Sequence, residues 1–424
     1  MRFALRPVRA LGQASTFRAP THLSTRCYSS VTSNGHRSPP LAGITVVSLE
    51  QAIAAPFCTR QLADLGARVI KVERPCVGDF ARQYDDRVNG MSSHFVWTNR
   101  SKESLALDLK DRNDHAVLMR LLGQADVLVQ NLAPGASARL GLSHDVLKEK
   151  HPSLIVCDIS GYGQDGPYRD KKAYDLLIQS EAGMLSVTGT GTEPVKVGIS
   201  IADIAAGMYA YTNILSALLQ RGKDGQGCRI DISMLESMVE WMSFPMYYAF
   251  DGAAGPVPAG ASHAAIYPYG PFEASDGQIM LGIQNEREWA KFCSHVLCQP
   301  DLTSDSRFSN NTFRSKNRDE LKAVIDDTFS RLTAAETIAR LEVASIANAN
   351  LNDMHGVWKH AQLEARDRWV DIQTPTGAVQ ALLPPGSTKS ADQGGYEAQM
   401  GSVPEVGEHN KAILAELGLT EKND

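Results

Sequence analysis

The chain has 424 residues with 42 Lys and Arg against 48 Asp and Glu, a net charge of −6. This length suggests two or three domains, and 43% hydrophobic with 21% charged residues is typical of a globular protein rather than a disordered or collagen-like one. No apolar run approaches the ~18 residues that would span a bilayer, and the acidic balance argues against a nucleic-acid partner. The 7 cysteines form no C-x-x-C pair, which speaks against a disulfide or zinc framework and favours a reducing compartment.

The amino-terminal segment carries a different charge from the rest. Residues 1–49 contain no Asp, Glu or Lys, and arginines stand at positions 2, 6, 9, 18, 26 and 37. An Arg- and Ser-rich start without acids is typical of a mitochondrial transit peptide. We therefore predict a transit peptide over residues 1–28, cleaved after Tyr28, and a location in the mitochondrial matrix; the alternative is a disordered basic tail.

The next 120 residues alternate between strands and helices. Apolar, β-branched runs predict strands over 41–49, 67–73, 105–109, 127–131 and 154–159. Helices are expected up to Leu65, over 112–124 and over 143–150, the first ending at Gly66. This order predicts an α/β fold with a parallel, Rossmann-like, doubly wound sheet, whose sites lie at the carboxyl ends of the strands.

The second half predicts a smaller companion domain. A long apolar helix is expected over 202–220, then a strand over 228–233 and a helix to about residue 250. The Gly- and Pro-rich segment 251–260 marks a boundary or mobile loop. A smaller α+β domain follows, with helices over 286–298, 317–331 and 334–343, and the tail carries strands 369–373 and 378–383 and a helix over 408–417. The predicted divisions are a large domain beginning at 41–225, a linker with a glycine-rich loop over 226–265, the small domain over 266–355, and a return segment over 356–424 that completes the large domain.

Common catalytic motifs find little support. Gly161-Tyr162-Gly163-Gln164-Asp165-Gly166 matches G-x-G-x-x-G, but it follows a late strand rather than the first, so a glycine-rich turn is favoured over a nicotinamide site. No P-loop and no G-x-S-x-G occurs. The histidines show no H-x-x-x-H pair, so no catalytic metal is expected.

Asp203 stands at the start of the long apolar helix, in Ile201-Ala202-Asp203-Ile204-Ala205. An acidic residue at the start of a predicted helix favours the interpretation of Asp203 as the helix N-cap. The alternative is functional: the helix start would keep the carboxylate ionised, small neighbours would leave room for a substrate, and such a carboxylate can act as a nucleophile.

Several cations lie in loops on the carboxyl side of predicted strands. They are Arg74, Lys110, Arg139 and the pair Lys171-Lys172. Together they could collect phosphates in the crevice of the sheet. Taken singly, each is more simply read as a solvated surface charge.

Motifs from Leu41 to the carboxyl terminus resemble family III CoA-transferases. The motifs, in order, are Leu41-Ala42-Gly43, the run from Asp64 to Pro75, Gly78-Asp79, Asn131-Leu132-Ala133-Pro134-Gly135, the glycine-rich turn at 161–167, Asp203 with Gly207, and Gly225-Gln226-Gly227. The resemblance implies an interlocked homodimer with an acyl-CoA and a small carboxylic acid as substrates. It implies no permanently bound cofactor, because the CoA thioester is itself a substrate.

The resemblance also implies roles for single residues. Asp203 falls on the family's nucleophilic aspartate, which forms mixed anhydrides and an aspartyl-CoA thioester. The residues matching positions that line CoA are Arg74, Lys110, Asn131, Leu132, Arg139 and Lys172, and Ala52, Ile53 and Ala54 match the loop beside the thioester. Formyl-CoA transferase carries Gln where this chain has Ile53, which argues against oxalate or formate. Residues 259–263 match a mobile glycine-rich loop, from which a backbone amide is expected to stabilise the oxyanion.

Two other functions stay open at this point. An α-methylacyl-CoA racemase would use a His-Asp pair upstream of Asp203, but this chain has Tyr174-Asp175, and a tyrosine with pKa near ~10 is a poor base at neutral pH. A non-catalytic acyl-CoA-binding protein would not need Asp203. The mitochondrial start and the stretches 163–167 and 207–211 look most like the succinyl-CoA:dicarboxylate (glutarate-type) branch, with glutarate, itaconate or a similar acid as the acceptor and an arginine or His263 as the cation for its second carboxylate.

Overall fold

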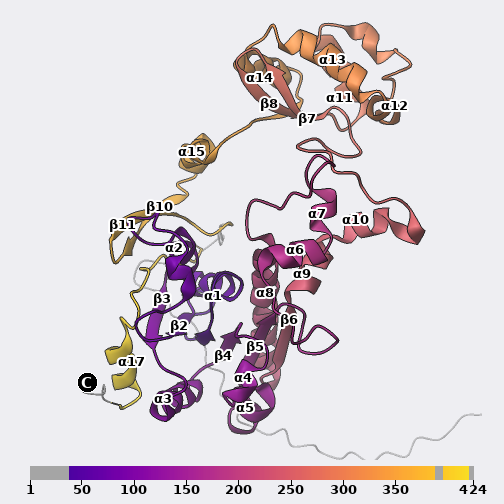
Figure 1. The fold of residues 1–424 in the computed structure, drawn as a ribbon. Helices are drawn as coiled ribbons and strands as arrows, with labels where there is room; N and C mark the ends of the chain where they lie inside the picture. Colours follow the sequence, from indigo (N-terminus) through magenta and orange to yellow (C-terminus); the bar gives the residue numbers. More distant parts are fainter. Residues whose placement is uncertain (1–37, 387–394, 420–424) are drawn as a thin grey trace, which may run out of the picture. The chain divides into compact units, whose positions relative to one another are not determined.

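A six-stranded, fully parallel sheet organises the chain in the computed structural model, which describes residues 38–386 and 395–419 (Figure 1). The strands stand in the order β3-β2-β1-β4-β5-β6. Their bounds are β1 Thr45–Leu49, β2 Arg68–Glu73, β3 Lys102–Ala106, β4 Val127–Gln130, β5 Ile155–Ser160 and β6 Arg229–Ser233. The predicted Rossmann-like sheet is therefore confirmed. The predicted transit peptide lies outside the described residues.

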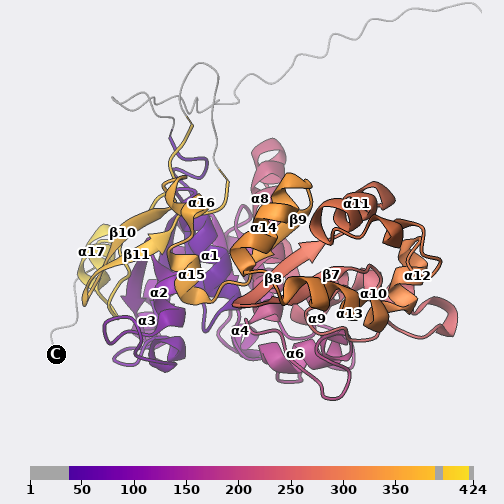
Figure 2. The same cartoon turned by 90° about the horizontal axis from the view of Figure 1, so that it is seen from above.

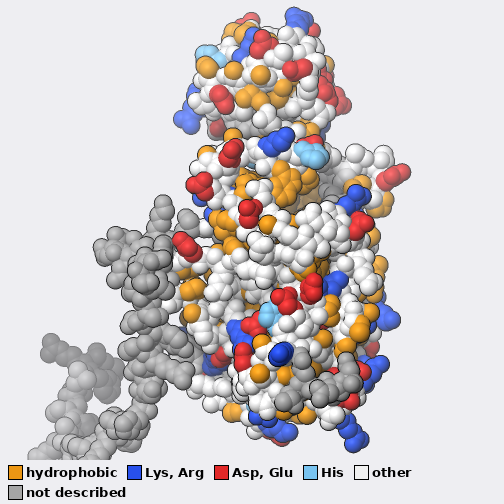
Figure 3. Space-filling model, turned by 90° about the vertical axis from the view of Figure 1, so that its left-hand side faces the viewer, with side chains coloured by type: hydrophobic (Ala, Val, Ile, Leu, Met, Phe, Trp, Pro, Cys, Tyr) orange, Lys and Arg blue, Asp and Glu red, His pale blue; other side chains and the backbone are white. Residues whose placement is uncertain are grey.

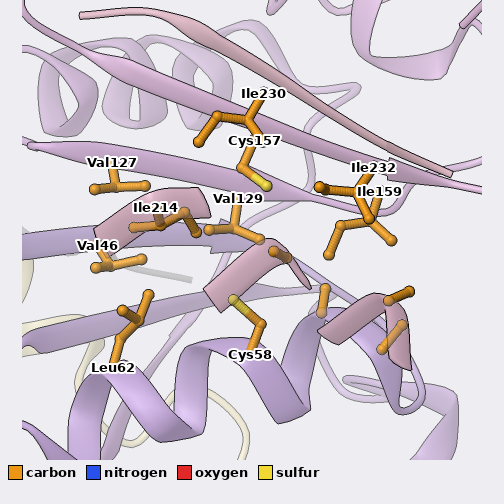
Figure 4. Close-up of a cluster of buried hydrophobic side chains, with 14 of the residues drawn as sticks. Val46, Cys58, Leu62, Val127, Val129, Cys157, Ile159, Ile214, Ile230 and Ile232 are labelled. Carbon is orange, nitrogen blue, oxygen red and sulfur yellow. The ribbon is translucent and has the colours of Figure 1, made fainter. Parts of the chain in front are cut away.

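Alternating side chains of the strands bury both faces of this sheet. One face packs on α1 (Ala54–Asp64) and α8 (Ile201–Asp224), and Figure 4 shows the resulting core. Its labelled members are Val46, Cys58, Leu62, Val127, Val129, Cys157, Ile159, Ile214, Ile230 and Ile232. The opposite face packs on α3 (Arg112–Leu122), α5 (His144–Lys150) and α17 (Asn410–Glu416), through Leu118, Leu147 and Ile413. Two covered faces are what a parallel sheet requires.

A glycine allows α8 to lie directly against α1. A Cβ atom at Gly207 would stand 2.7 Å from the Ala54 carbonyl oxygen and 3.0 Å from Phe57 Cδ1. The two helix backbones can therefore approach only because residue 207 has no side chain. Asp203 lies one turn earlier on α8, so this contact brings it beside the start of α1.

The smaller domain combines an antiparallel sheet with helices, in agreement with the predicted α+β class. Its strands are β7 (Tyr269–Ala274), β8 (Gly277–Gly282) and β9 (Ala347–Asn350), in the order β7-β8-β9. The helices are α11 (Glu286–Lys291), α12 (Asn311–Lys316), α13 (Arg318–Phe329) and α14 (Ala334–Val343), with a π-helical turn over Phe292–Val296. They enclose a core of their own around Trp289, Phe292 and Phe329.

The carboxyl-terminal segment adds to the region of the large sheet. The hairpin of β10 (Trp369–Thr374) and β11 (Gly377–Leu382) packs on α2 (Ser93–Asn99) through Ile372 and Phe95 (Figure 2). The start of α17 is fixed to β3, because Asn410 Oδ1 accepts the Ala106 amide at 2.7 Å. Residues far apart in sequence thus pack against the elements of the large domain.

The differences from the predicted elements have local causes. The strand expected over 105–109 is β3 at Lys102–Ala106, and the helix expected to run to residue 250 divides into α9 (Met234–Trp241) and α10 (Ser243–Tyr248), which contains Pro245. The strand predicted over 228–233 is β6, which joins the large sheet although the domain division placed it in the linker 226–265. The short helices that had no prediction are α2, α4 (Ala136–Arg139), α6 (Asp175–Glu181), α7 (Met184–Val187), α12, α15 (Met354–Trp358) and α16 (Ala361–Glu364).

Acidic, basic and hydrophobic side chains are interspersed on the face of the protein drawn in Figure 3. Over residues 38–386 and 395–419, no helix is both long enough and apolar enough to cross a membrane.

Candidate active site

The sheet order reverses between β1 and β4, and the loops that follow these two strands are joined there. The backbone amide of Gln51 donates to Asn131 Oδ1 at 2.9 Å, and Asn131 Nδ2 donates back to the Gln51 carbonyl at 2.8 Å. In doubly wound folds, ligands bind in the crevice outside the carboxyl ends of the strands at this reversal. The predicted CoA-lining residue Asn131 therefore holds the two loops that border the crevice.

Two cavities adjoin at this crevice. The first, of about 610 Å³, has largely apolar walls, three cations, Arg74, Lys110 and Arg139, and two acids, Glu73 and Asp108. Its apolar lining includes Leu49, Val72, Leu107, Leu109, Leu132 and Leu140. Within the described chain these three cationic side chains have no ion-pair partner. Unpaired cations around an apolar pocket suit a ligand with an anionic group and an apolar body.

The second cavity, of about 560 Å³, contains Asp203 and shares three lining residues with the first, Gln51, Phe80 and Leu132. The remaining predicted positions also line it: Ala52, Ile53, Ala54, Asn131 and Lys172. All the site residues predicted from the sequence thus fall on two adjoining cavities, the cations that match phosphate positions mainly in one and the proposed nucleophile in the other. Residues 259–263 line neither cavity.

The predicted N-cap role of Asp203 is wrong. Helix α8 begins at Ile201 with Ser200 in the cap position, so Asp203 lies inside the first turn. The capping acceptor is Asp175, whose Oδ1 receives the amides of Ala202 at 2.8 Å and Asp203 at 3.4 Å. Because another carboxylate satisfies these amides, the Asp203 side chain is left available for chemistry.

The electrostatic expectation for Asp203 is also corrected. Burial and, second, the charge of Asp175 raise the pKa of Asp203 to about 7. The helix start does not hold this carboxylate fully ionised, because its amides are directed at Asp175 instead. A carboxyl group that titrates near neutral pH in a cavity is a candidate for catalysis.

The loop before α1 has a strained conformation beside the cavity that contains Asp203. Ala52 has φ of 61°, a left-handed value unusual for a residue with a side chain. Its amide donates to Asp79 Oδ1 at 3.0 Å, and Asp79 also accepts the Ala81 amide at 2.9 Å. Since α1 begins at Ala54 without a side-chain cap, its first amides can donate to a developing negative charge.

A buried charge network includes Asp79 and thereby fixes the residue that holds this loop. Lys71 Nζ lies 2.8 Å from Asp79 and 3.3 Å from Glu50, and Lys102 Nζ lies 2.7 Å from Glu50. All four side chains are fully buried. Burial would raise the pKa of Glu50, but the Lys102 and Lys71 ammoniums outweigh it and lower the value to about 2. Sequence reasoning missed this network because charged residues in strands usually indicate an exposed face.

Two further side chains of the second cavity were not predicted. Tyr84 and His94 line it, and their rings meet edge to face with centroids 5.3 Å apart. Neither residue belongs to a sequence motif, so nothing in the sequence distinguishes these two from the other aromatic and histidine residues of the chain. Tyr174 and Asp175, the pair that replaces the racemase His-Asp, line the same cavity.

The turn with the G-x-G-x-x-G pattern is not a dinucleotide fingerprint. It follows β5, and α6 begins only at Asp175. A Cβ atom at Gly161 would stand 2.2 Å from Ala173 Cβ, which accounts for this glycine by packing. In the described residues, no group of three or more His, Cys, Asp or Glu side chains could hold a metal ion.

Comparison with known proteins gives consistent matches over nearly the whole chain. The family model described as CoA-transferase family III matches residues 41–410. Succinyl-CoA:glutarate CoA-transferase of Mus musculus is 32% identical over 380 residues, 89% of this chain and 86% of that protein. Succinate–glutarate CoA-transferase of Agrobacterium fabrum is 31% identical, over 91% of this chain and 98% of that protein. The crystal structure of a CAIB/BAIF family protein from Brucella suis matches with a TM-score of 0.80 and 31% identity, over 90% of this chain and all of that one.

Proposed function

The chain belongs to CoA-transferase family III, and from this premise we propose that it moves CoA from succinyl-CoA to a free C4–C6 dicarboxylic acid such as glutarate or itaconate. Relatives named for succinyl-CoA, succinate and glutarate support this choice of acids. The observation that carries the proposed mechanism is the position of Asp203, in a cavity that adjoins the cation-lined, apolar-walled pocket.

The donor half of the reaction begins with the Asp203 carboxylate. One of its oxygens attacks the thioester carbonyl, the C–S bond breaks, and CoA leaves as a thiolate, so that a mixed aspartyl-acyl anhydride forms. The thiolate then attacks the aspartyl carbonyl, giving an aspartyl-CoA thioester and the free donor acid. The two steps divide a difficult exchange into two easier ones.

The acceptor half reverses this order. The acceptor carboxylate attacks the aspartyl thioester, forming a second anhydride and releasing the thiolate again. The thiolate attacks the acceptor carbonyl, which yields the new CoA thioester and restores the Asp203 carboxylate. Each attack develops an oxyanion; the uncapped amides at the start of α1, with Ala54 in the cavity lining, support the proposal that they stabilise it.

A substrate panel tests the proposed acids. The purified protein is incubated with succinyl-CoA and separately with glutarate, itaconate and monocarboxylic acids, and the CoA thioesters are identified by mass. We expect glutaryl-CoA or itaconyl-CoA to form together with succinate. If no dicarboxylic acid yields a thioester, the proposed substrates are wrong.

The pH dependence of kcat/KM for succinyl-CoA provides a further prediction. Only the ionised form of Asp203 is a nucleophile, and its pKa is raised to about 7. The rate constant should therefore fall about tenfold per pH unit below this pKa. In Asp175→Asn the amide oxygen can still accept the Ala202 amide, but the negative charge that raises the pKa of Asp203 is gone.

The acid limb of the profile should thus move to lower pH in Asp175→Asn. Asp224→Asn, at the exposed far end of the same helix, is the matched control and should leave the limb in place. A limb in Asp175→Asn that coincides with that of the unaltered protein, or lies at higher pH, would contradict the electrostatic role of Asp175.

We also propose the mitochondrial matrix as the location, on the composition of residues 1–49, which include arginines but no acids and no Lys. Amino-terminal sequencing of the protein isolated from its own cells should begin near Ser29. A mature protein that keeps residues 1–28 would contradict cleavage.

Exposed aromatic side chains support the proposed homodimer. On and after α10, Phe244, Tyr247 and Phe250 are 63%, 78% and 73% exposed. Clustered exposed aromatic surface is typical of protein interfaces. Light scattering should give twice the chain mass, and a mass equal to one chain at micromolar concentration would contradict the dimer.

A further inference from the structure

A dicarboxylic acid needs a second anchoring group besides Asp203, and the second cavity contains one that the family resemblance did not indicate. His94, the second residue of α2, lines this cavity together with Asp203 and Tyr84. His263, the histidine considered from the sequence, stacks on Tyr269 and does not line the cavity. The question is whether His94 is built to hold an anion.

Asp85 fixes the ring of His94. His94 Nδ1 lies 3.2 Å from Asp85 Oδ2. Asp85 is itself held by the Ser93 amide and hydroxyl, each at 2.8 Å, and the Ser93 and Arg87 amides keep the pKa of this carboxyl well below its usual range. A permanently ionised acceptor at Nδ1 keeps a proton on that nitrogen and leaves Nε2 as the ring's free polar atom.

Nε2 of His94 has no hydrogen-bond partner among the residues that the structure describes. The imidazolium form of His94 would donate from both nitrogens, to Asp85 through Nδ1 and to a substrate carboxylate through Nε2. The arrangement therefore suits an acid group.

Tyr84 connects His94 to the proposed nucleophile. Its ring meets His94 edge to face at 5.3 Å. Burial is the main cause that raises the pKa of Tyr84 to about 12, and the charges of Asp79 and Asp203 add to it. Tyr84, His94 and Asp203 all line the second cavity.

The other cations of this cavity are less suited to the role. Lys171 is paired with Glu181 and lies over the rings of Tyr162 and Tyr168. Lys172 matches a CoA-lining position. His94 remains the group that is held rigidly, with its free nitrogen unused.

We propose that His94 binds the distal carboxylate of the dicarboxylic acid and thereby selects dicarboxylic over monocarboxylic acids. This inference rests on the proposed function. His94 acts on specificity: it touches the substrate's far end and takes no part in the covalent steps.

The test compares glutarate with pentanoate, which has the same chain length but lacks the distal carboxylate. In His94→Asn the side-chain amide can still donate to Asp85, but nothing replaces Nε2. We expect kcat/KM for glutarate to fall on the order of 10- to 100-fold, mainly through KM, while the value for pentanoate stays within about twofold. His94→Gln, whose amide can reach the position of Nε2, should retain part of the preference. His295→Asn, an exposed histidine of the smaller domain, is the control and should change neither value.

The outcomes separate the two proposals. If the unaltered protein transfers CoA to pentanoate but to no dicarboxylic acid, the proposed function fails. If it prefers glutarate and His94→Asn keeps that preference, the role of His94 is wrong; a loss of preference in Lys172→Gln instead would assign the distal carboxylate to Lys172. Where transfer to pentanoate is too slow to measure, a rise in the KM for glutarate at an unchanged Tm supports the inference, and an unchanged KM overturns it.

Discussion

Asp203→Asn is expected to lower kcat for CoA transfer by roughly 10⁴-fold or more, the scale found when an enzyme loses its covalent nucleophile. The asparagine side chain has nearly the same size and lies at the same place in the first turn of α8. It cannot form the anhydride or the aspartyl thioester, so both halves of the exchange stop. Succinyl-CoA should still bind, because its proposed phosphate contacts, Arg74, Lys110 and Arg139, lie in the adjoining cavity.

Two measurements accompany this prediction. Exchange of labelled succinate into succinyl-CoA reports the donor half reaction alone, and hydroxylamine trapping followed by mass spectrometry reports whether residue 203 becomes acylated. Asp224→Asn should behave like the unaltered protein in both. Rapid exchange in Asp203→Asn, or trapped hydroxamate at another residue, would remove Asp203 from the mechanism.

Glu50→Gln is expected to lower the free energy of unfolding by about 3–5 kcal/mol, the usual cost of removing one partner from a buried ion pair. Glu50 is fully buried and lies 2.7 Å from Lys102 Nζ and 3.3 Å from Lys71 Nζ. The substitution leaves the Lys102 ammonium in the interior with neutral acceptors in place of the Glu50 charge: the introduced amide oxygen, the Asn99 side chain and the Pro56 carbonyl.

The matched control for this variant is Glu103→Gln on β3, next to Lys102 in the sequence. Glu103 pairs with Arg68 at 2.7 Å, but both side chains are partly exposed, so its loss should cost less than about 1 kcal/mol. Urea titration of both variants at pH 7 checks the difference. Equal midpoints for the two variants would contradict the structural importance of the buried network.

The effect of Glu50→Gln should also depend on pH. The pKa of Glu50 is about 2 in the folded protein against an ordinary value of 4.5. A carboxyl whose pKa is depressed by folding contributes stability above its unfolded pKa and loses that contribution as the pH falls towards the folded value. The difference between Glu50→Gln and the unaltered protein should therefore be complete above about pH 5 and shrink as the pH falls towards 2.

The elements that could be predicted from the sequence are those whose pattern is local. β1, β2, β4 and β5 are rich in β-branched and other apolar residues, and such segments, alternating with helices, indicate a parallel sheet. The observed strand β3 begins three residues before the predicted one. Lys102 and Ser104 are polar and did not suggest a buried strand, yet both side chains are buried. Helix α2 is short and has no distinctive start in the sequence, so it could not be predicted.

The site residues also depend on contacts between distant parts of the chain. The local sequence predicted Asp203 as a helix cap, yet the carboxylate that accepts the first amides of α8 belongs to Asp175, 28 positions earlier in the chain. The resemblance to a family predicted Asp203 as the nucleophile and the CoA-lining positions, and these residues fall on the two cavities. It gave no reason to single out His94, because the importance of this residue depends on a partner, Asp85, that only the fold brings near.

The lining that the two cavities share sets a fixed spacing between the cations and Asp203. Gln51, Phe80 and Leu132 follow the ends of rigid strands or lie in loops tied to them by hydrogen bonds. On the proposed mechanism, this spacing selects the donor by length. The thioester reaches Asp203 only when the arm that carries it is long enough for the phosphates to bind Arg74 and Arg139. Binding energy from the remote nucleotide is thereby converted into placement of the reacting carbonyl. A short acyl thioester without the nucleotide could occupy the second cavity and still be a poor donor.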